Sequence, residues 1–292
     1  MKSEKQFYVP SVRTHLIECQ TIGQVFQIQV MQPLMKYGSE ERFPVLYLTD
    51  ANLSFDFAKG ISHCLQSAGQ VRRFILVGIG YPGDNPFAGS VLRCRDMTSK
   101  WFPEIPGLPR SSPIADVDGI DANGKNWGGA REFLAFIRDQ LVAFIDTTYP
   151  TIAGDRAYFG HSLGGGFGLH ALFSDAAIFG KYVISSPGIC YDGDQYGIRE
   201  AQEFIASGRP LNAHLVMSVG EEEEFERDVG RAQLVSSFYR LAALLRASSI
   251  PTLKFSCYVI PEATHVSVWP SAFSNGVQAI YGPADSSPTA AP

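Results

Sequence analysis

The residues of this sequence that could carry out chemistry include a serine held between two glycines. Ser162 lies in the stretch YFGHSLGGGFGLH (158–170), which contains the pattern G-x-S-x-G. The pattern alone is weak, because glycine and serine are common and a match is expected by chance in roughly one such chain in four. Its surroundings are more specific, since an apolar run ends at this serine and a helical stretch follows it. A strand, a sharp turn and a helix form a nucleophile elbow, so we predict that Ser162 is a nucleophile.

The glycines around Ser162 suit such a turn. Gly160 and Gly164 leave room where the chain reverses, and three further glycines (165, 166 and 168) would let the helix lie close to a sheet. The first N–H groups of that helix, at the positive end of its dipole, could stabilise a developing oxyanion.

A serine hydroxyl needs a base, and in proteins with this elbow the chain order is serine, acid, histidine. Only His214 and His265 lie well downstream of Ser162. His214 begins a predicted strand and precedes any acid at the end of that strand. His265 follows the last predicted strand, in PEATHVSVW, where a loop can return it over a sheet. A single histidine in a loop is usually a surface residue, but order and position favour His265 as the base.

The acid should follow the predicted strand AHLVMSVG, where the chain continues GEEEEFERD. An acidic run of this kind is more often a solvated segment that opens a helix. One of its members could still be the orienting acid, and six carboxylates compete for that role: Glu221, Glu222, Glu223, Glu224, Glu226 and Asp228.

The elements that must position these residues alternate along the chain. Short apolar runs predict eight strands, at 15–19, 24–31, 42–50, 71–80, 155–162, 180–187, 213–220 and 253–262. The last six are apolar throughout, which is typical of strands buried on both faces of a parallel sheet. Helical spacing predicts helices at 128–148, with a stripe of Phe133, Ile137, Leu141 and Phe144, and at 226–247, with Leu234, Phe238, Leu241 and Leu245. Together these predict an α/β fold whose mostly parallel sheet of about eight strands has helices on both faces.

We expect one domain over residues 1–283, followed by a tail at 284–292 without fixed structure. Residues 81–127 are rich in proline and show little periodicity, so we predict a long insertion near the active site. It leaves from the end of a predicted strand at Gly80, where ligands bind in α/β sheets. Its Trp101 and Phe102 are therefore expected to wall a substrate pocket.

Composition excludes several kinds of partner. The net charge of −5 argues against nucleic acid, and the sequence has no apolar run long enough to span a membrane. The five cysteines show no C-x-x-C spacing, and the N-terminus has no signal-peptide pattern, so we expect reduced thiols in a cytoplasmic protein without a metal site. No phosphate-binding motif G-x-x-x-x-G-K-[ST] occurs, and we expect no cofactor. Arg93, Arg95 and Asp96 could recognise an acidic substrate group or form a structural ion pair.

Several motifs together resemble the esterase family of α/β-hydrolases that includes esterase D, enterochelin-type siderophore esterases, feruloyl esterases and the antigen 85 proteins. They are FPVLYLTDAN, RCRDMT, GGAREFLAFI, YFGHSLGGGFGLHALF, SPGI, SVGEEEE and THVSV, and they cover about residues 12–281. The resemblance implies an α/β-hydrolase fold and a serine esterase that needs no cofactor and acts on a small-molecule ester, with a homodimer left open.

Carried over by motif, the resemblance implies that Ser162 is the nucleophile, His265 the base and Glu223, three residues after Gly220, the acid. It also implies that the N–H groups of Leu163 and Asn52 form the oxyanion hole, although Ala51 stands where the family usually has glycine. The substrate pocket is expected to include these residues: Trp101, Phe102, His161, Ile189 and Tyr191.

The substrate stays open at this point. Siderophore esterases of the family often carry tryptophan after an S-P-S motif, whereas this chain reads SPGICYDG. Two alternative functions also stay open: an acyltransferase of the same fold, and a catalytically silent binding scaffold. An intact serine, acid and histidine argues against the scaffold.

Overall fold

The computed structural model describes residues 11–34, 40–83, 88–100, 128–174, 178–190, 193–227, 229, 232–248 and 250–283. They form a single eight-stranded sheet in the order β1-β2-β4-β3-β5-β6-β7-β8. The strands are β1 Val12–Cys19, β2 Gln24–Met31, β3 Phe43–Leu48, β4 Ile75–Gly80, β5 Thr151–His161, β6 Lys181–Ser185, β7 Ala213–Gly220 and β8 Leu253–Ile260. All eight predicted strands are present.

The sheet is parallel from β4 to β8, and the hairpin β1–β2 joins it antiparallel at β4. Every residue of β3 and β4 is buried, as expected for central strands covered on both faces. β1 lies at one edge and alternates between more exposed and more buried residues. This arrangement confirms the predicted α/β fold.

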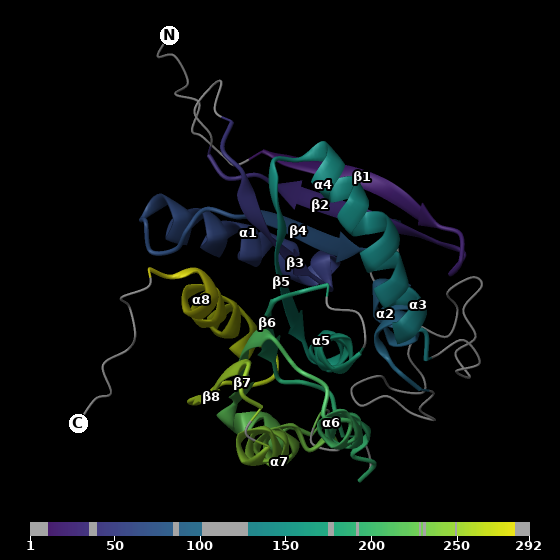
Figure 1. Ribbon diagram of the computed structural model, residues 1–292, viewed down its shortest axis with the longest axis vertical. Coiled ribbons are helices and arrows are strands. Elements are labelled where there is room, and N and C mark those ends of the chain that lie inside the picture. The colour runs from purple at the N-terminus through teal and green to yellow at the C-terminus, as the bar shows by residue number, and fades with distance from the viewer. Residues whose placement is uncertain are drawn as a thin grey trace.

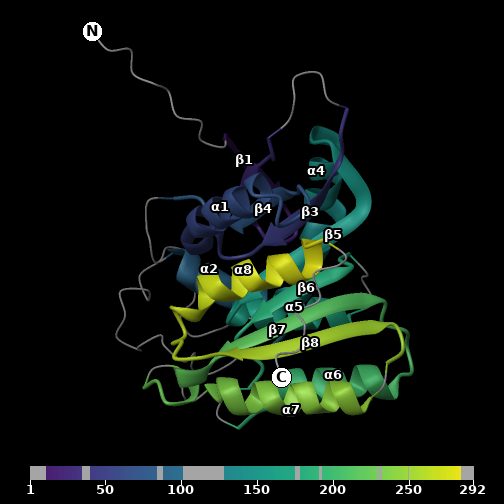
Figure 2. The ribbon, with the colours of Figure 1, turned by 90° about the vertical axis from the view of Figure 1, so that its left-hand side faces the viewer.

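Helices cover both faces of the sheet (Figures 1 and 2). α1 (Ala51–Ser67) and α8 (Val268–Tyr281) lie side by side over one face and enclose the smaller core cluster. The larger cluster lies on the other face, beneath a second set of helices: α3 Ala130–Phe136, α4 Val142–Thr148, α5 Leu163–Phe173, α6 Tyr196–Ala206 and α7 Leu234–Ala247. No helix in the described part of the chain is long and apolar enough to cross a membrane.

The predicted helix at 128–148 contains a wider turn in its middle. The π-helical segment η2 (Ile137–Leu141) joins α3 to α4. Of the four predicted stripe residues, Phe133, Ile137 and Leu141 are fully buried, and Phe144 is half-buried and packs against the larger cluster. The predicted stripe is therefore present, although the sequence prediction assumed an unbroken α-helix.

Two further differences from the prediction concern helices. The helix expected at 226–247 begins only at Leu234, because the Glu224 carboxylate accepts hydrogen bonds from the N–H groups of Val235 and Ser236 and so caps the helix there. Within the predicted insertion 81–127, residues Ala88–Met97 form helix α2, which the sequence analysis missed. Most of the rest of that insertion, including Trp101 and Phe102, lies outside the described residues, as does the tail 284–292.

Candidate active site

Ser162 stands on a sharp turn between β5 and α5. Its backbone has φ 58° and ψ −119°, a region that residues other than glycine rarely adopt. A Cβ atom on Gly160 would lie 2.2 Å from the carbonyl oxygen of Gly164, and backbone on the other side of so tight a turn cannot move aside. The expected need for glycine at these two positions is therefore confirmed. The turn is held from both sides, since the Ser162 N–H donates to Ser185 O (3.0 Å) and the Gly166 and Gly188 N–H groups donate to Ser162 O (both 2.9 Å).

His265 lies beside the elbow, in the short loop between β8 and α8. Its ring centroid is 4.5 Å from that of His161, the residue directly before Ser162. Its Nδ1 is 2.7 Å from Oε2 of Glu223. An ionised carboxylate can only accept a hydrogen bond, so Nδ1 carries the proton and Nε2 is left with a free lone pair. This is the tautomer that a general base requires.

Glu223 is fully buried, and each of its oxygens has a partner. Oε1 accepts hydrogen bonds from the Gly220 N–H and from the Ser186 hydroxyl, each at 2.6 Å, while Oε2 faces His265. The carboxylate is thus fixed in one orientation by strand ends β6 and β7. Ser186 adopts a left-handed backbone (φ 44°), which directs its hydroxyl toward this acid.

The neighbouring carboxylates have other partners. Glu221 accepts from the Glu262 N–H (3.0 Å), Glu224 caps α7, and Glu226 accepts from the backbone N–H of His265. Glu222 is exposed. Of the carboxylates in this run that the structure describes, Glu223 is the one that contacts the His265 ring.

Two helix N-termini meet in front of the serine. Leu163 is the first residue of α5, and Asn52 is the second of α1. The N–H groups of a first helical turn have no partner within their own helix. Because β3 and β5 are adjacent in the sheet, these two turns lie side by side at its carboxyl edge. The N–H groups of Leu163 and Asn52 are thus the candidates for the predicted oxyanion hole.

A buried ion pair holds the two turns together. The Asp50 carboxylate accepts hydrogen bonds from Nε (2.6 Å) and Nη2 (2.9 Å) of Arg93, which lies on α2. A Cβ atom on Gly164 would lie 3.1 Å from Asp50 Oδ2, so this carboxylate packs directly on the start of α5. Although burial lowers the pKa of Arg93, the Asp50 charge outweighs it and leaves that pKa above its ordinary value. Arg93 is thus half of a structural pair, and Arg95 pairs with Asp96 (2.7 Å).

The Asn52 side chain has a separate structural role. Its amide exchanges two hydrogen bonds of 2.8 Å with the backbone of Tyr81, just beyond β4. These bonds fix the first turn of α1 against the neighbouring strand end.

His161 is buried beside His265, the candidate general base. It is 3% exposed, its Nδ1 lies 3.0 Å from the Ser185 hydroxyl, and its ring stacks on Trp269 (4.6 Å between centroids). Burial, together with the nearby charges of His265 and Arg93, lowers the pKa of His161 well below its ordinary value. The ring is therefore neutral and supports His265 by packing.

Of the remaining predicted pocket residues, the structure describes only Ile189. Ile189 is buried in the larger core cluster, where a Cβ on Gly197 would meet it at 2.6 Å. Trp101, Phe102 and Tyr191 lie outside the described residues. Sequence reasoning missed Ser186 as the residue that anchors Glu223, and the only available signal was its place in the SPGI motif.

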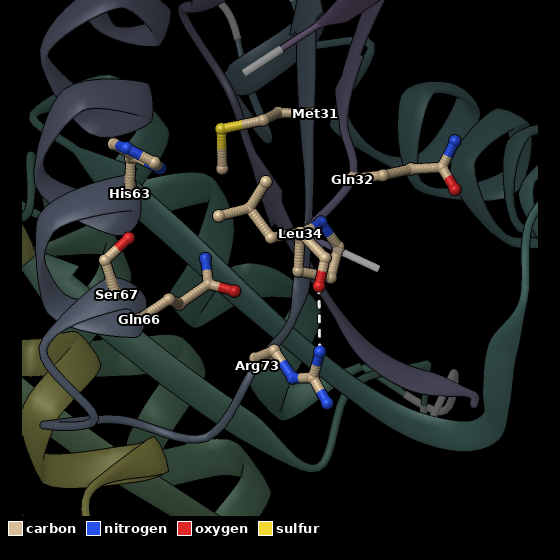
Figure 3. Close-up of a pocket in the computed structure, with 8 residues that line it drawn as sticks. Met31, Gln32, Leu34, His63, Gln66, Ser67 and Arg73 are labelled. Carbon is tan, nitrogen blue, oxygen red and sulfur yellow. Dashed lines mark hydrogen bonds between the residues drawn. The ribbon is translucent and has the colours of Figure 1, made fainter. Parts of the chain in front are cut away.

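A small pocket also occurs far from Ser162 (Figure 3). It is lined by Met31, Leu34, His63 and Arg73 among others, and Arg73 donates to Leu34 O (2.8 Å). Met31 pairs with Leu76 near the amino end of β4. Ligands of α/β sheets bind at the carboxyl ends of the strands, so this pocket is not the active site.

The fold and the serine turn define an α/β-hydrolase. A family model described as "Putative esterase" matches residues 107–234. The ferri-bacillibactin esterase BesA of Bacillus subtilis is 25% identical over 251 residues, which cover 82% of this chain and 80% of that protein. The siderophore enterobactin esterase of Emericella nidulans is 34% identical over 217 residues, 68% of this chain and 66% of that one.

The crystal structure of the BES protein from Bacillus cereus superposes with a TM-score of 0.75 and 27% identity, covering 95% of this chain and 99% of the other. The chain belongs to this esterase family, of the enterochelin-esterase type. It is a carboxylic ester hydrolase.

Proposed function

We propose that this esterase works through a Ser162–His265–Glu223 triad and a covalent acyl-enzyme. The contact that supports it best is the 2.7 Å pair between His265 Nδ1 and Glu223 Oε2, next to the strained serine turn. It leaves Nε2 of His265 free to take the serine proton.

The proposed reaction has two halves. His265 removes the hydroxyl proton as Ser162 Oγ attacks the ester carbonyl, and the N–H groups of Leu163 and Asn52 stabilise the oxyanion. The intermediate collapses when His265 protonates the leaving alcohol, which leaves an acyl group on Ser162. Water, deprotonated by the same imidazole, then attacks the acyl-enzyme and releases the acid. Throughout, Glu223 orients His265 and stabilises its charged form.

We further propose that the natural substrate is an ester bond within a siderophore. The support is the activity named for the relatives, which are esterases of ferri-bacillibactin and enterobactin. The run SPGICYDG lacks the tryptophan often found there in siderophore esterases, so we do not restrict the proposal to catecholate siderophores. None of the five cysteines forms a disulfide. This fits a reducing compartment, and we include a cytoplasmic location in the proposal.

The first test is the Ser162→Ala variant. It should lose on the order of a thousandfold or more in kcat for p-nitrophenyl esters and should no longer react with a fluorophosphonate probe, because the covalent nucleophile is gone. Ser207→Ala, which removes a hydroxyl at the far end of α6, is the matched control and should keep both properties. A Ser162→Ala protein that is still labelled and active would refute the proposal. Adding alcohol acceptors to the wild type would reveal acyl transfer as new ester products.

A further inference from the structure

Three large apolar side chains are exposed next to residues of the proposed site. Phe225 is 84% exposed, Val266 76% and Leu53 65%. Each is close in sequence to a residue of the site: Val266 follows His265, Leu53 follows Asn52, and Phe225 comes two residues after Glu223. Single exposed apolar residues are normal on a protein surface, so their positions relative to one another decide whether they form a feature.

Leu53 and Val266 each lie one turn before a side chain of the contact that joins α1 to α8. The rings of Phe57 on α1 and Trp269 on α8 are 5.5 Å apart. Leu53 is one turn before Phe57, and Val266, whose carbonyl accepts from the Trp269 N–H (3.4 Å), is one turn before Trp269. Both helices begin at the carboxyl edge of the sheet, and they lie alongside each other in both views (Figures 1 and 2). The two exposed side chains therefore continue this aromatic contact up to the edge where Ser162 lies.

Phe225 approaches the same place from the acid loop. The residue after it, Glu226, accepts a hydrogen bond from the backbone N–H of His265. This bond holds the Phe225 segment against the His265–Val266 loop. We define Leu53, Val266 and Phe225 as the apolar rim.

The apolar rim lies on the side of the leaving group. In the proposed reaction His265 returns its proton to the leaving alcohol, so the ester oxygen must come within about 3 Å of the imidazole. Val266 follows His265 in the chain, Phe225 precedes the Glu226 that binds the His265 backbone, and Leu53 follows Asn52 of the proposed oxyanion turn. The alcohol half of a bound ester then passes over these three side chains.

The charged residues around the apolar rim also affect which substrates can bind there. Its exposed or half-buried neighbours include the carboxylates Glu221, Glu222, Glu226 and Glu262 and one guanidinium, Arg227. This balance is negative and repels an anionic group close to the rim.

We propose that the apolar rim is the binding subsite for the alcohol half of the substrate, and that it contacts an apolar, uncharged part of that half. This inference rests on the proposed serine esterase mechanism. It makes Leu53, Val266 and Phe225 specificity-determining residues.

Two series of esters test the proposal: acetates of ethanol, butanol and hexanol, and ethyl esters of acetic, butyric and hexanoic acids. In the wild type, kcat/KM should rise about twofold to fourfold for each methylene added to the alcohol, as expected when the chain is removed from water. Val266→Thr keeps the branched shape beside His265 and removes the apolar surface. Both Val266→Thr and Phe225→Ser should reduce the rise in kcat/KM along the alcohol series. Neither should change the dependence of kcat/KM on acyl chain length. A terminal sulfonate, in 3-sulfopropyl acetate, should lower kcat/KM relative to propyl acetate.

Leu16→Ser, which removes an exposed leucine on the edge strand β1, is the matched control and should leave both slopes unchanged. Equal alcohol slopes in the wild type and both rim variants would overturn the proposal, as would flattening of the acyl series instead. Hydrolysis of none of these esters by the wild type would refute the esterase mechanism itself, which separates the two failures.

Discussion

At the scale of single residues, the glutamate run shows what local chemistry can and cannot predict. Its carboxylates are alike in sequence, and only the resemblance to the esterase family pointed to Glu223. The structure distinguishes them by where the chain turns, since Gly220 ends β7 and a single 3-10 turn, Glu221–Glu224, follows. Such a turn rotates successive side chains by about 120°, so one glutamate faces inward and its neighbours face outward. The partner Ser186, from another strand, has no signal in the run itself.

Glu223→Gln should lower kcat by about a hundredfold or more, because an amide cannot stabilise the charged form of His265. Glu222→Gln removes an exposed carboxylate of the same size and should stay near wild type. Ester hydrolysis by both variants, measured after confirming equal thermal midpoints, distinguishes the two. A large loss in Glu222→Gln with little in Glu223→Gln would show that the acid is misassigned.

At the scale of helices and strands, the sequence predicted all eight strands and the stripes of two helices. Apolar runs bounded by turn residues are a strong signal, and α7 buries the four residues expected of it. The failures came where a tertiary contact determines the element. The cap from Glu224 delays the start of α7, a π turn interrupts the preceding helix at Ile137–Leu141, and the Arg93–Asp50 ion pair anchors α2. None of these contacts is visible in local periodicity.

The Arg93–Asp50 pair ties α2 to the starts of α1 and α5, and it should be needed for stability. Arg93→Met leaves the Asp50 carboxylate, 3% exposed, without its partner, and breaking a buried pair in this way costs about 3–5 kcal/mol. Arg93→Lys keeps the charge but not the paired geometry and should lose less. Urea unfolding of the two variants measures the difference.

The double variant Arg93→Met/Asp50→Asn supplies the control. It removes the stranded charge, and asparagine tolerates the left-handed backbone of residue 50 (φ 59°). We expect it to be more stable than Arg93→Met alone. If the double variant loses as much free energy of unfolding as Arg93→Met and Asp50→Asn lose together, the two residues are not coupled.

At the scale of the whole molecule, buried histidines make the stability depend on pH. Burial lowers the pKa of His161 well below its ordinary value, and burial with the charges of Lys254 and Lys181 lowers that of His214 to about 4. The native protein thus binds fewer protons than the unfolded chain below the ordinary histidine pKa of about 6.5. The free energy of unfolding should therefore be full above that pH and fall as the pH drops toward 4.

His161→Phe tests this at one position, because it keeps a ring between Trp269 and His265 and removes the titrating group. Its loss in free energy of unfolding between pH 7.5 and pH 5 should be smaller than that of the wild type. Ser185→Ala removes the hydrogen-bond partner of His161 without removing the imidazole. It should change the free energy of unfolding at pH 7.5 and at pH 5 by a similar amount. An equal pH dependence in His161→Phe and the wild type would contradict the neutral, buried imidazole.

The four consecutive glutamates also constrain which insertions and deletions the gene can tolerate. Loss of any one of their codons gives the same shortened protein, Gly220 followed by three glutamates and phenylalanine. If the shortened chain keeps its register from Gly220 onward, the third glutamate would still reach His265, but the cap of α7 would be lost. If the chain instead keeps its register with α7, the cap would remain and the carboxylate facing His265 would be displaced. A single in-frame deletion in this repeat thus forces a choice between a capped helix and an oriented histidine, although every remaining residue type is unchanged.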